Sequence, residues 1–132
     1  MANTGRCYCG EIQYESDGDA VMKGQCHCRE CQYISGGSPN VCIGVPEASF
    51  SYTKGTPKGF KRSDLDNPVT RDFCENCGTH IAARTQGMMV LKVGTLDNPA
   101  DFEGPQMVIY TVDKQPFHHI PDGIPSFERT PG

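Results

Sequence analysis

The spacing of the cysteines constrains this chain more than any other feature. Seven of its eight cysteines fall into three short clusters, and Cys42 stands alone. The clusters are Cys7-x-Cys9, Cys26-x-Cys28-x-x-Cys31 and Cys74-x-x-Cys77. Pairs and triplets this close typically bind zinc, whose structural sites are often tetrahedral sets of thiolates. Two pairs and one triplet therefore predict one closed zinc site and one site with an open position.

The size and composition predict a single domain, residues 1–132, made mainly of β-structure. A chain of 132 residues can bury a core of its own, and its 15 glycines and 10 prolines favour short strands and turns over long helices. The formal charge of −4 predicts no basic surface for nucleic acid or for an anionic membrane. We therefore expect neither as a partner.

The N-terminal residues Met1–Cys7 contain no apolar stretch, so no secretory signal is expected. No run approaches the roughly 18 apolar residues that a membrane span needs. These features predict a cytoplasmic protein, in which thiols stay reduced and clustered cysteines indicate metal binding or catalysis. The alternative is a secreted domain held by disulfides, which the cysteine spacing disfavours.

Hydrophobic alternation and turn residues predict many short strands. The first strand is expected around Ile12 and Tyr14. Further strands are expected at Val41–Val45, Ser49–Thr53, Gly59–Arg62, Val69–Phe73, His80–Arg84, Met88–Val93 and Met107–Val112. One helical segment is expected at Arg29–Ser35, and Pro116–Gly132 is expected to form an extended tail packed across the domain.

The two cysteine pairs predict a closed, structural zinc site. Cys7-x-Cys9-Gly10 and Cys74-x-x-Cys77-Gly78 both end in a glycine, which can take the positive φ of a tight turn. Cysteines one residue apart close too small a ring for an unstrained mutual disulfide, but they can share a metal. Combining the pairs ties the first strand to the middle of the chain, so that metal binding would stabilise the fold.

The triplet of Cys26, Cys28 and Cys31 predicts a catalytic zinc site, because three protein ligands leave a fourth position for water or substrate. His27 is a strained alternative ligand, since its neighbours must face the same ion. A redox-active disulfide within the triplet is a further alternative, although no thioredoxin-like pattern surrounds it. Cys42 is interpreted as a small buried apolar residue.

Five motifs in sequence resemble the glutathione-dependent formaldehyde-activating enzyme family, which includes the centromere protein V domain. The motifs lie at Cys7–Tyr14, Cys26–Gly36, Phe73–Ile81, Val93–Asp97 and Asp122–Phe127. The resemblance implies a mostly antiparallel β-tent fold with two zinc ions. It implies that Cys7, Cys9, Cys74 and Cys77 hold a structural zinc and that Cys26, Cys28 and Cys31 hold the catalytic one.

Two positions depart from the family pattern. Val108-Ile109-Tyr110 stands where members commonly carry a His-aliphatic-aromatic triplet, and the chain lacks the tryptophan that commonly follows, with Phe117 the nearest match. These positions are expected to shape the substrate pocket, so the departures bear on the identity of the substrate.

The predicted activity is that of a carbon–sulfur lyase: the reversible addition of a glutathione-like thiol to a small, formaldehyde-like aldehyde. A zinc-bound thiol is readily deprotonated, and zinc can also polarise an aldehyde oxygen. Glu30 and His27 are candidate proton donors by proximity in the sequence, with solvated surface positions as the alternative. His80 is expected to make a buried hydrogen bond, and His118 or His119 could reach the open site.

Two other functions stay open from the sequence. A zinc-stabilised binding module without catalysis would explain the clusters and the altered pocket positions, and a redox or metal-storage protein would explain the thiols. The basic residues of the segment 54–62 could bind the carboxylates of glutathione, but a solvated strand face is the favoured interpretation. These residues are Lys54, Lys58, Lys61 and Arg62.

Overall fold

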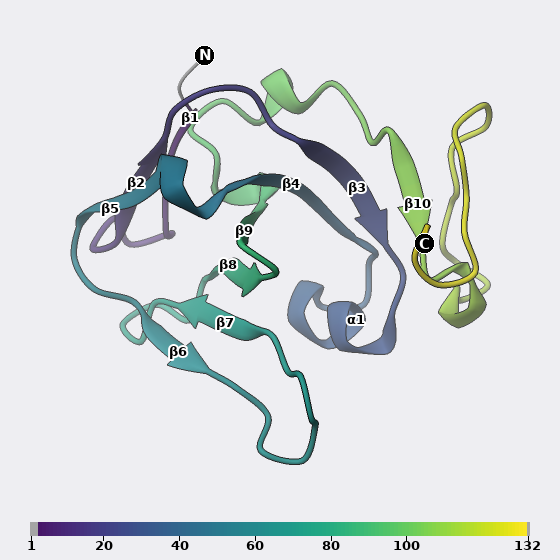
Figure 1. The fold of residues 1–132 in the computed structure, drawn as a ribbon, viewed down its shortest axis with the longest axis horizontal. Helices are drawn as coiled ribbons and strands as arrows, with labels where there is room; N and C mark the ends of the chain where they lie inside the picture. The colour runs from purple at the N-terminus through teal and green to yellow at the C-terminus, as the bar shows by residue number, and fades with distance from the viewer. Residues whose placement is uncertain (1–2, 132) are drawn as a thin grey trace.

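The computed structural model describes residues 3–131, which form two β-sheets and one short α-helix (Figure 1). Residues 1, 2 and 132, the ends of the predicted domain and tail, lie outside the described residues. The smaller sheet has the strand order β1 (Asn3–Arg6), β2 (Gln13–Ser16) and β5 (Phe50–Lys54). The larger sheet has the order β10 (Met107–Ile109), β3 (Met22–Cys26), β4 (Asn40–Pro46), β9 (Met88–Lys92), β8 (His80–Thr85), β7 (Thr70–Phe73) and β6 (Lys58–Phe60).

The predicted helix is present as α1 (Arg29–Ser35). It begins after Cys28, whose sulfur accepts a hydrogen bond from the backbone N–H of Cys31, and it ends at Gly36, which has a left-handed φ of 80°. Short 3₁₀ segments connect other strands; they are η1 (Glu47–Ser49), η2 (Val93–Thr95), η3 (Pro99–Phe102) and η4 (Thr111–Asp113). No helix in the described part of the chain is long and apolar enough to cross a membrane.

The alternation of β9 divides its side chains between the core and the opposite face of the sheet. Met89 and Leu91 are fully buried and pair with Val45 and Ile43 of β4. Lys92 is opposite Cys42 in the same register. Because residues directly opposite each other in an antiparallel pair share a face, Lys92 and Cys42 lie on the face away from this core.

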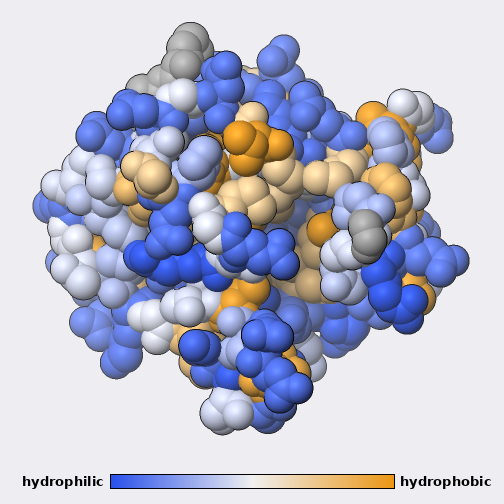
Figure 2. Space-filling model, viewed as in Figure 1, coloured by the Kyte–Doolittle hydropathy of each residue, from blue (hydrophilic) through white to orange (hydrophobic). Residues whose placement is uncertain are grey.

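The outer surface is mostly hydrophilic. Figure 2 shows hydrophilic residues over most of one face of the molecule, with hydrophobic residues gathered in its middle and in smaller separate spots. A surface of this kind fits a chain with a net charge of −4 and an ordinary buried core.

The mainly β prediction is confirmed, and the strands expected from Val41 onward are present with ends shifted by a few residues. Two strands were missed, β1 and β3, because neither shows hydrophobic alternation. β10 is shorter than expected: Tyr110, with a φ of 57°, leaves the extended conformation directly after Ile109. β10 also pairs with β3 in parallel, which makes the larger sheet mixed.

The C-terminal tail runs beside β10, as the extended segment at the edge of Figure 1 shows. The backbone N–H of Val108 donates to the carbonyl of Pro125, and the N–H of Phe127 donates to the carbonyl of Val108. Ser126, between these two tail residues, forms a parallel bridge with Val108. The tail therefore extends the larger sheet at its β10 edge, and β10 lies between the tail and β3, the strand that ends at Cys26.

Candidate metal centres

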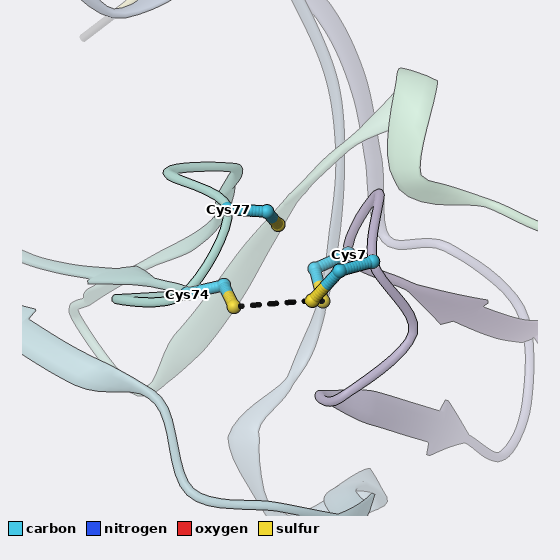
Figure 3. Close-up of side chains that lie close together, drawn as sticks. Cys7, Cys74 and Cys77 are labelled. Carbon is cyan, nitrogen blue, oxygen red and sulfur yellow. Dashed lines mark hydrogen bonds between the residues drawn. The ribbon is translucent and has the colours of Figure 1, made fainter.

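The first thiol cluster joins two turns that lie far apart in the sequence. Cys7 and Cys9 follow β1, and Cys74 and Cys77 follow β7 (Figure 3). The four sulfur atoms all lie within 4.8 Å of one another. The structure thus brings together all four cysteines that the sequence analysis combined into one site.

The spacing of these sulfurs fits a tetrahedral zinc site. Cys9 Sγ lies 3.6 Å from Cys7 Sγ and 3.8 Å from Cys74 Sγ. A tetrahedron with zinc–sulfur bonds of about 2.3 Å has edges of about 3.8 Å, whereas a disulfide would hold two sulfurs about 2.05 Å apart. An all-thiol donor set with these edges matches zinc in both chemistry and size.

The two turns that carry the cluster have similar backbones. Gly10 and Gly78 have φ angles of 82° and 80°, and their N–H groups donate to the carbonyls of Cys7 and Cys74. Both angles lie in the left-handed region, where glycine is favoured. The backbone N–H of Ile12 also donates to Cys7 Sγ at 3.3 Å, which favours a thiolate there.

Hydrogen bonds lower the pKa of one thiol in this cluster, and burial raises the pKa of another. The hydroxyl of Thr79, 3.2 Å from Cys77 Sγ, lowers the pKa of Cys77 to about 5, and backbone N–H groups act in the same direction. Burial raises the pKa of Cys74 to about 11. Thiolate is thus favoured at Cys77, as it is at Cys7, before any cation is bound.

The second thiol cluster lies where β3 passes into α1. Cys26 ends β3, Cys28 caps α1 and Cys31 lies in its first turn, and their sulfurs lie within 4.8 Å of one another. Cys28 accepts hydrogen bonds from the other two thiols, which lower its pKa to about 2, whereas the pKa of Cys26 is raised by the same contact. Three thiols at this spacing could bind a metal ion with a position left over.

His27 is fully buried and is engaged by residues other than the thiols. Gln25 Nε2 donates to His27 Nε2 at 3.0 Å, and His27 Nδ1 lies 3.0 Å from His118 Nδ1. His118 Nδ1 accepts from the N–H of Gln115, and its Nε2 donates to the carbonyl of Gly37 at 2.7 Å. Both rings are then neutral, with His27 donating to His118.

The four histidines lie in environments that can be compared with their predicted roles. Both ring nitrogens of His27 have partners other than the thiols, and His27 does not belong to the second thiol cluster. His118 reaches His27 and not the thiols, and His119 is exposed. His80 is half-buried, and its ring packs against Phe73. Within residues 3–131 the imidazole ring of His80 makes no hydrogen bond, contrary to the expectation.

A cavity of about 360 Å³ lies beside the second cluster. Asn40 lines this cavity and also approaches Cys31 Sγ, with its amide nitrogen 3.8 Å away. His80 and Lys92 line it too, and Thr79 links it to the first cluster. Neither Asn40 nor Lys92 could be identified from the sequence, because neither stands in a motif.

Lys92 is half-buried. Burial lowers the pKa of its ammonium group, while the neighbouring thiols of Cys31 and Cys42 act in the opposite direction. Cys42 itself is buried, as expected, and burial raises its pKa to about 12.

Glu30 and the basic segment 54–62 lie on the surface. Glu30 pairs with Arg62 at 3.4 Å and with Arg71 at 3.8 Å. The basic segment is exposed, as the favoured interpretation held, and Lys58 pairs with Glu75. At the positions that depart from the family pattern, Val108 is fully buried and Phe117 is 74% exposed, with its ring edge against His118.

Comparison with known proteins gives the family. The model of the family "Glutathione-dependent formaldehyde-activating enzyme" matches residues 2–113. The crystal structure of a Rhodobacter sphaeroides protein has a similar fold, with a TM-score of 0.60 and 17% identity, over 74% of this chain and 93% of that chain. No curated protein matches the sequence. Because the family model covers most of the chain, including both thiol clusters, the chain belongs to the glutathione-dependent formaldehyde-activating enzyme family.

Proposed function

We propose that this chain is a zinc-dependent carbon–sulfur lyase-type enzyme, which reversibly adds a glutathione-like thiol to a small, formaldehyde-like aldehyde. The observation that carries the proposal is the cluster of Cys26, Cys28 and Cys31, three thiols within 4.8 Å of one another next to a cavity of about 360 Å³. Three ligands with an accessible fourth position are typical of catalytic zinc sites. Membership of the family supports the choice of thiol and aldehyde as substrates.

The reaction forms one carbon–sulfur bond. The sulfur of the thiol donates an electron pair to the carbonyl carbon, the carbonyl π bond breaks, and its oxygen takes up a proton equivalent to the one that the thiol lost. A zinc ion held by the three cysteines would favour the thiolate form of a bound thiol or polarise the aldehyde oxygen. The reverse reaction returns the proton and breaks the same bond.

The residues of the chain have separable roles in this proposal. Cys26, Cys28 and Cys31 would hold the ion, and Asn40 would orient the thiolate of Cys31 through its amide N–H. The chain of hydrogen bonds from Gln25 through His27 to His118 would fix the loop that bears the triplet. We assign no role in the reaction to Glu30, whose carboxylate pairs with two arginines.

The first cluster has a structural role in the same proposal. Its four sulfurs would occupy all four positions of a tetrahedral ion and would leave none for a substrate. The ion there would join the turn after β1 to the turn after β7. We therefore propose two zinc ions per chain, one structural and one catalytic.

The test is zinc content together with adduct formation. The purified protein should hold two zinc ions per chain and should accelerate formation of the glutathione–formaldehyde adduct, followed by NMR. Cys31→Ser should fold, retain one zinc ion and lose the acceleration. A Cys31→Ser protein with two zinc ions and full activity would show that the triplet is not the catalytic site. Two four-ligand sites and no activity in the unmodified protein would instead favour a zinc-stabilised binding module.

A further inference from the structure

The register of the larger sheet lines up a row of side chains beside the second thiol cluster. Cys26 of β3 is opposite Asn40 of β4, and Cys42 of β4 is opposite Lys92 of β9. Asn40 and Cys42 are two residues apart and share a face of their strand. Lys92 therefore extends on the same face as Cys26 and Asn40, toward the site that the triplet forms.

Lys92 differs from the other cations near this site because no carboxylate balances it. Arg71 pairs with Glu30, and Arg84 pairs with the buried carboxylate of Asp72 at 3.1 Å. Within residues 3–131, the ammonium group of Lys92 has no ion pair. It also has no hydrogen bond, and because no buried polar side-chain atom there lacks a partner, Lys92 Nζ keeps some contact with solvent. The cavity that Lys92 lines contains no Asp or Glu side chain. A positive charge is thus held in a half-buried place, beside the thiol groups of Cys31 and Cys42.

The charge of a thiolate–metal site explains what such a cation can do. Three thiolates around a divalent ion leave one net negative charge, and a fourth thiolate from a substrate makes two. Accumulated negative charge opposes binding of an anionic ligand, most strongly where water is scarce. One ammonium group beside the site offsets this repulsion.

We propose that Lys92 is a positioning residue whose positive charge allows a substrate thiol to bind as a thiolate at the Cys26–Cys28–Cys31 cluster. The substrate sulfur approaches through the cavity that Lys92 and Asn40 line together. This inference rests on the proposed function, since it assigns a residue to the thiol-binding step of that reaction.

The experiment measures thiol binding and not turnover. Co²⁺ is exchanged into the second site, and its visible absorption reports a change of ligand during titration with 2-mercaptoethanol, a neutral thiol, or mercaptoacetate, an anionic one. Lys92→Met should weaken the binding of both thiols by about tenfold or more, a change of about 1.4 kcal/mol. Lys92→Arg should restore most of the affinity because it restores the charge. Lys54→Met, at an exposed lysine of β5, is the matched control and should bind like the unmodified protein.

The outcomes separate this inference from the function on which it rests. A lack of thiol binding by the unmodified Co²⁺ protein overturns both. Unchanged thiol affinity in Lys92→Met overturns the role of Lys92 alone. Weaker binding of mercaptoacetate but not of 2-mercaptoethanol also overturns it, because the lysine would then bind the carboxylate and not the sulfur. Lys92→Gln gives the same comparison if the methionine variant does not fold, as judged by circular dichroism and by retention of the first metal ion.

Discussion

His27 Nδ1 lies 3.0 Å from His118 Nδ1, although 91 residues separate the two rings along the chain. Both rings are buried, and the contact joins the loop of the cysteine triplet to the C-terminal segment. Gln32 of α1 strengthens the same junction, because its Nε2 donates to the carbonyl of Asp113 at 3.0 Å. The second thiol cluster is thus held in place by a part of the chain that contributes no thiol.

Replacing His118 should destabilise the protein. His118→Ala removes the acceptor of the buried His27 N–H, and leaving a buried donor without a partner costs about 1–3 kcal/mol. Urea unfolding of the metal-loaded protein measures the change. His119→Ala is the matched control, since this neighbouring side chain is exposed and should alter the stability by less than about 0.5 kcal/mol. Equal stabilities of the two variants would contradict the role of the His27–His118 contact.

The fold could be predicted where local patterns agree with the final structure. β9 alternates half-buried and fully buried side chains, and α1 has the residue bounds that the sequence predicts. β3 could not be predicted, because Met22–Cys26 contains a lysine, a glycine and a glutamine and gains its strand conformation from pairing with both β4 and β10. Such non-local pairing leaves no mark in a single-sequence pattern.

The candidate site could be predicted as far as the thiols are concerned. Their spacing dictates which sulfurs can share an ion, so Cys7 and Cys74 could be combined without coordinates. Asn40 and Lys92 could not be found in this way, because they reach the second cluster through the register of β4 with its neighbours. The contact between His27 and His118 depends on the path of the tail, which no short motif encodes.

Loss of the first metal should unfold or strongly destabilise the chain. Cys77→Ser removes one of the four sulfurs that join the turns after β1 and β7, so the variant should lose one zinc ion and a large part of its thermal stability. Metal analysis and a thermal melt measure both effects. Cys42→Ala is the matched control: this buried thiol belongs to neither cluster, so the variant should keep both ions. A stable Cys77→Ser protein with two ions would refute the structural role.

Tyr14 should make the stability of the protein depend on alkaline pH. Its hydroxyl lies 2.8 Å from Thr95 Oγ1, and burial raises its pKa to about 12 from an ordinary value of 10.0. Above pH 10 the unfolded state loses this proton first, so the stabilisation is complete below pH 10 and is lost as the pH rises through 12. Two pKa units correspond to about 2–3 kcal/mol.

The comparison with Tyr14→Phe isolates this effect, because the other tyrosines and the thiols ionise in both proteins. Free energies of unfolding are measured between pH 9 and about pH 12. Tyr14→Phe should be less stable near neutral pH, since it loses the contact with Thr95, and its stability should fall less steeply with pH. Parallel curves for the two proteins would rule out a raised pKa of Tyr14.

A methyl group at Gly5 should disturb the packing of β1 against Tyr14 of β2 and Thr95 of η2. A Cβ atom there would lie 2.3 Å from Tyr14 Oη and 2.4 Å from the carbonyl oxygen of Thr95, both too close for any real contact. Because Tyr14 is fully buried, it cannot move away freely, and overpacking of this kind costs about 1–3 kcal/mol. Gly94→Ala is the matched substitution, since its Cβ would meet nothing within 4 Å. Chemical denaturation should therefore show a lower midpoint for Gly5→Ala than for Gly94→Ala, and the opposite order would mean that β1 does not pack against Tyr14 and Thr95 as closely as described.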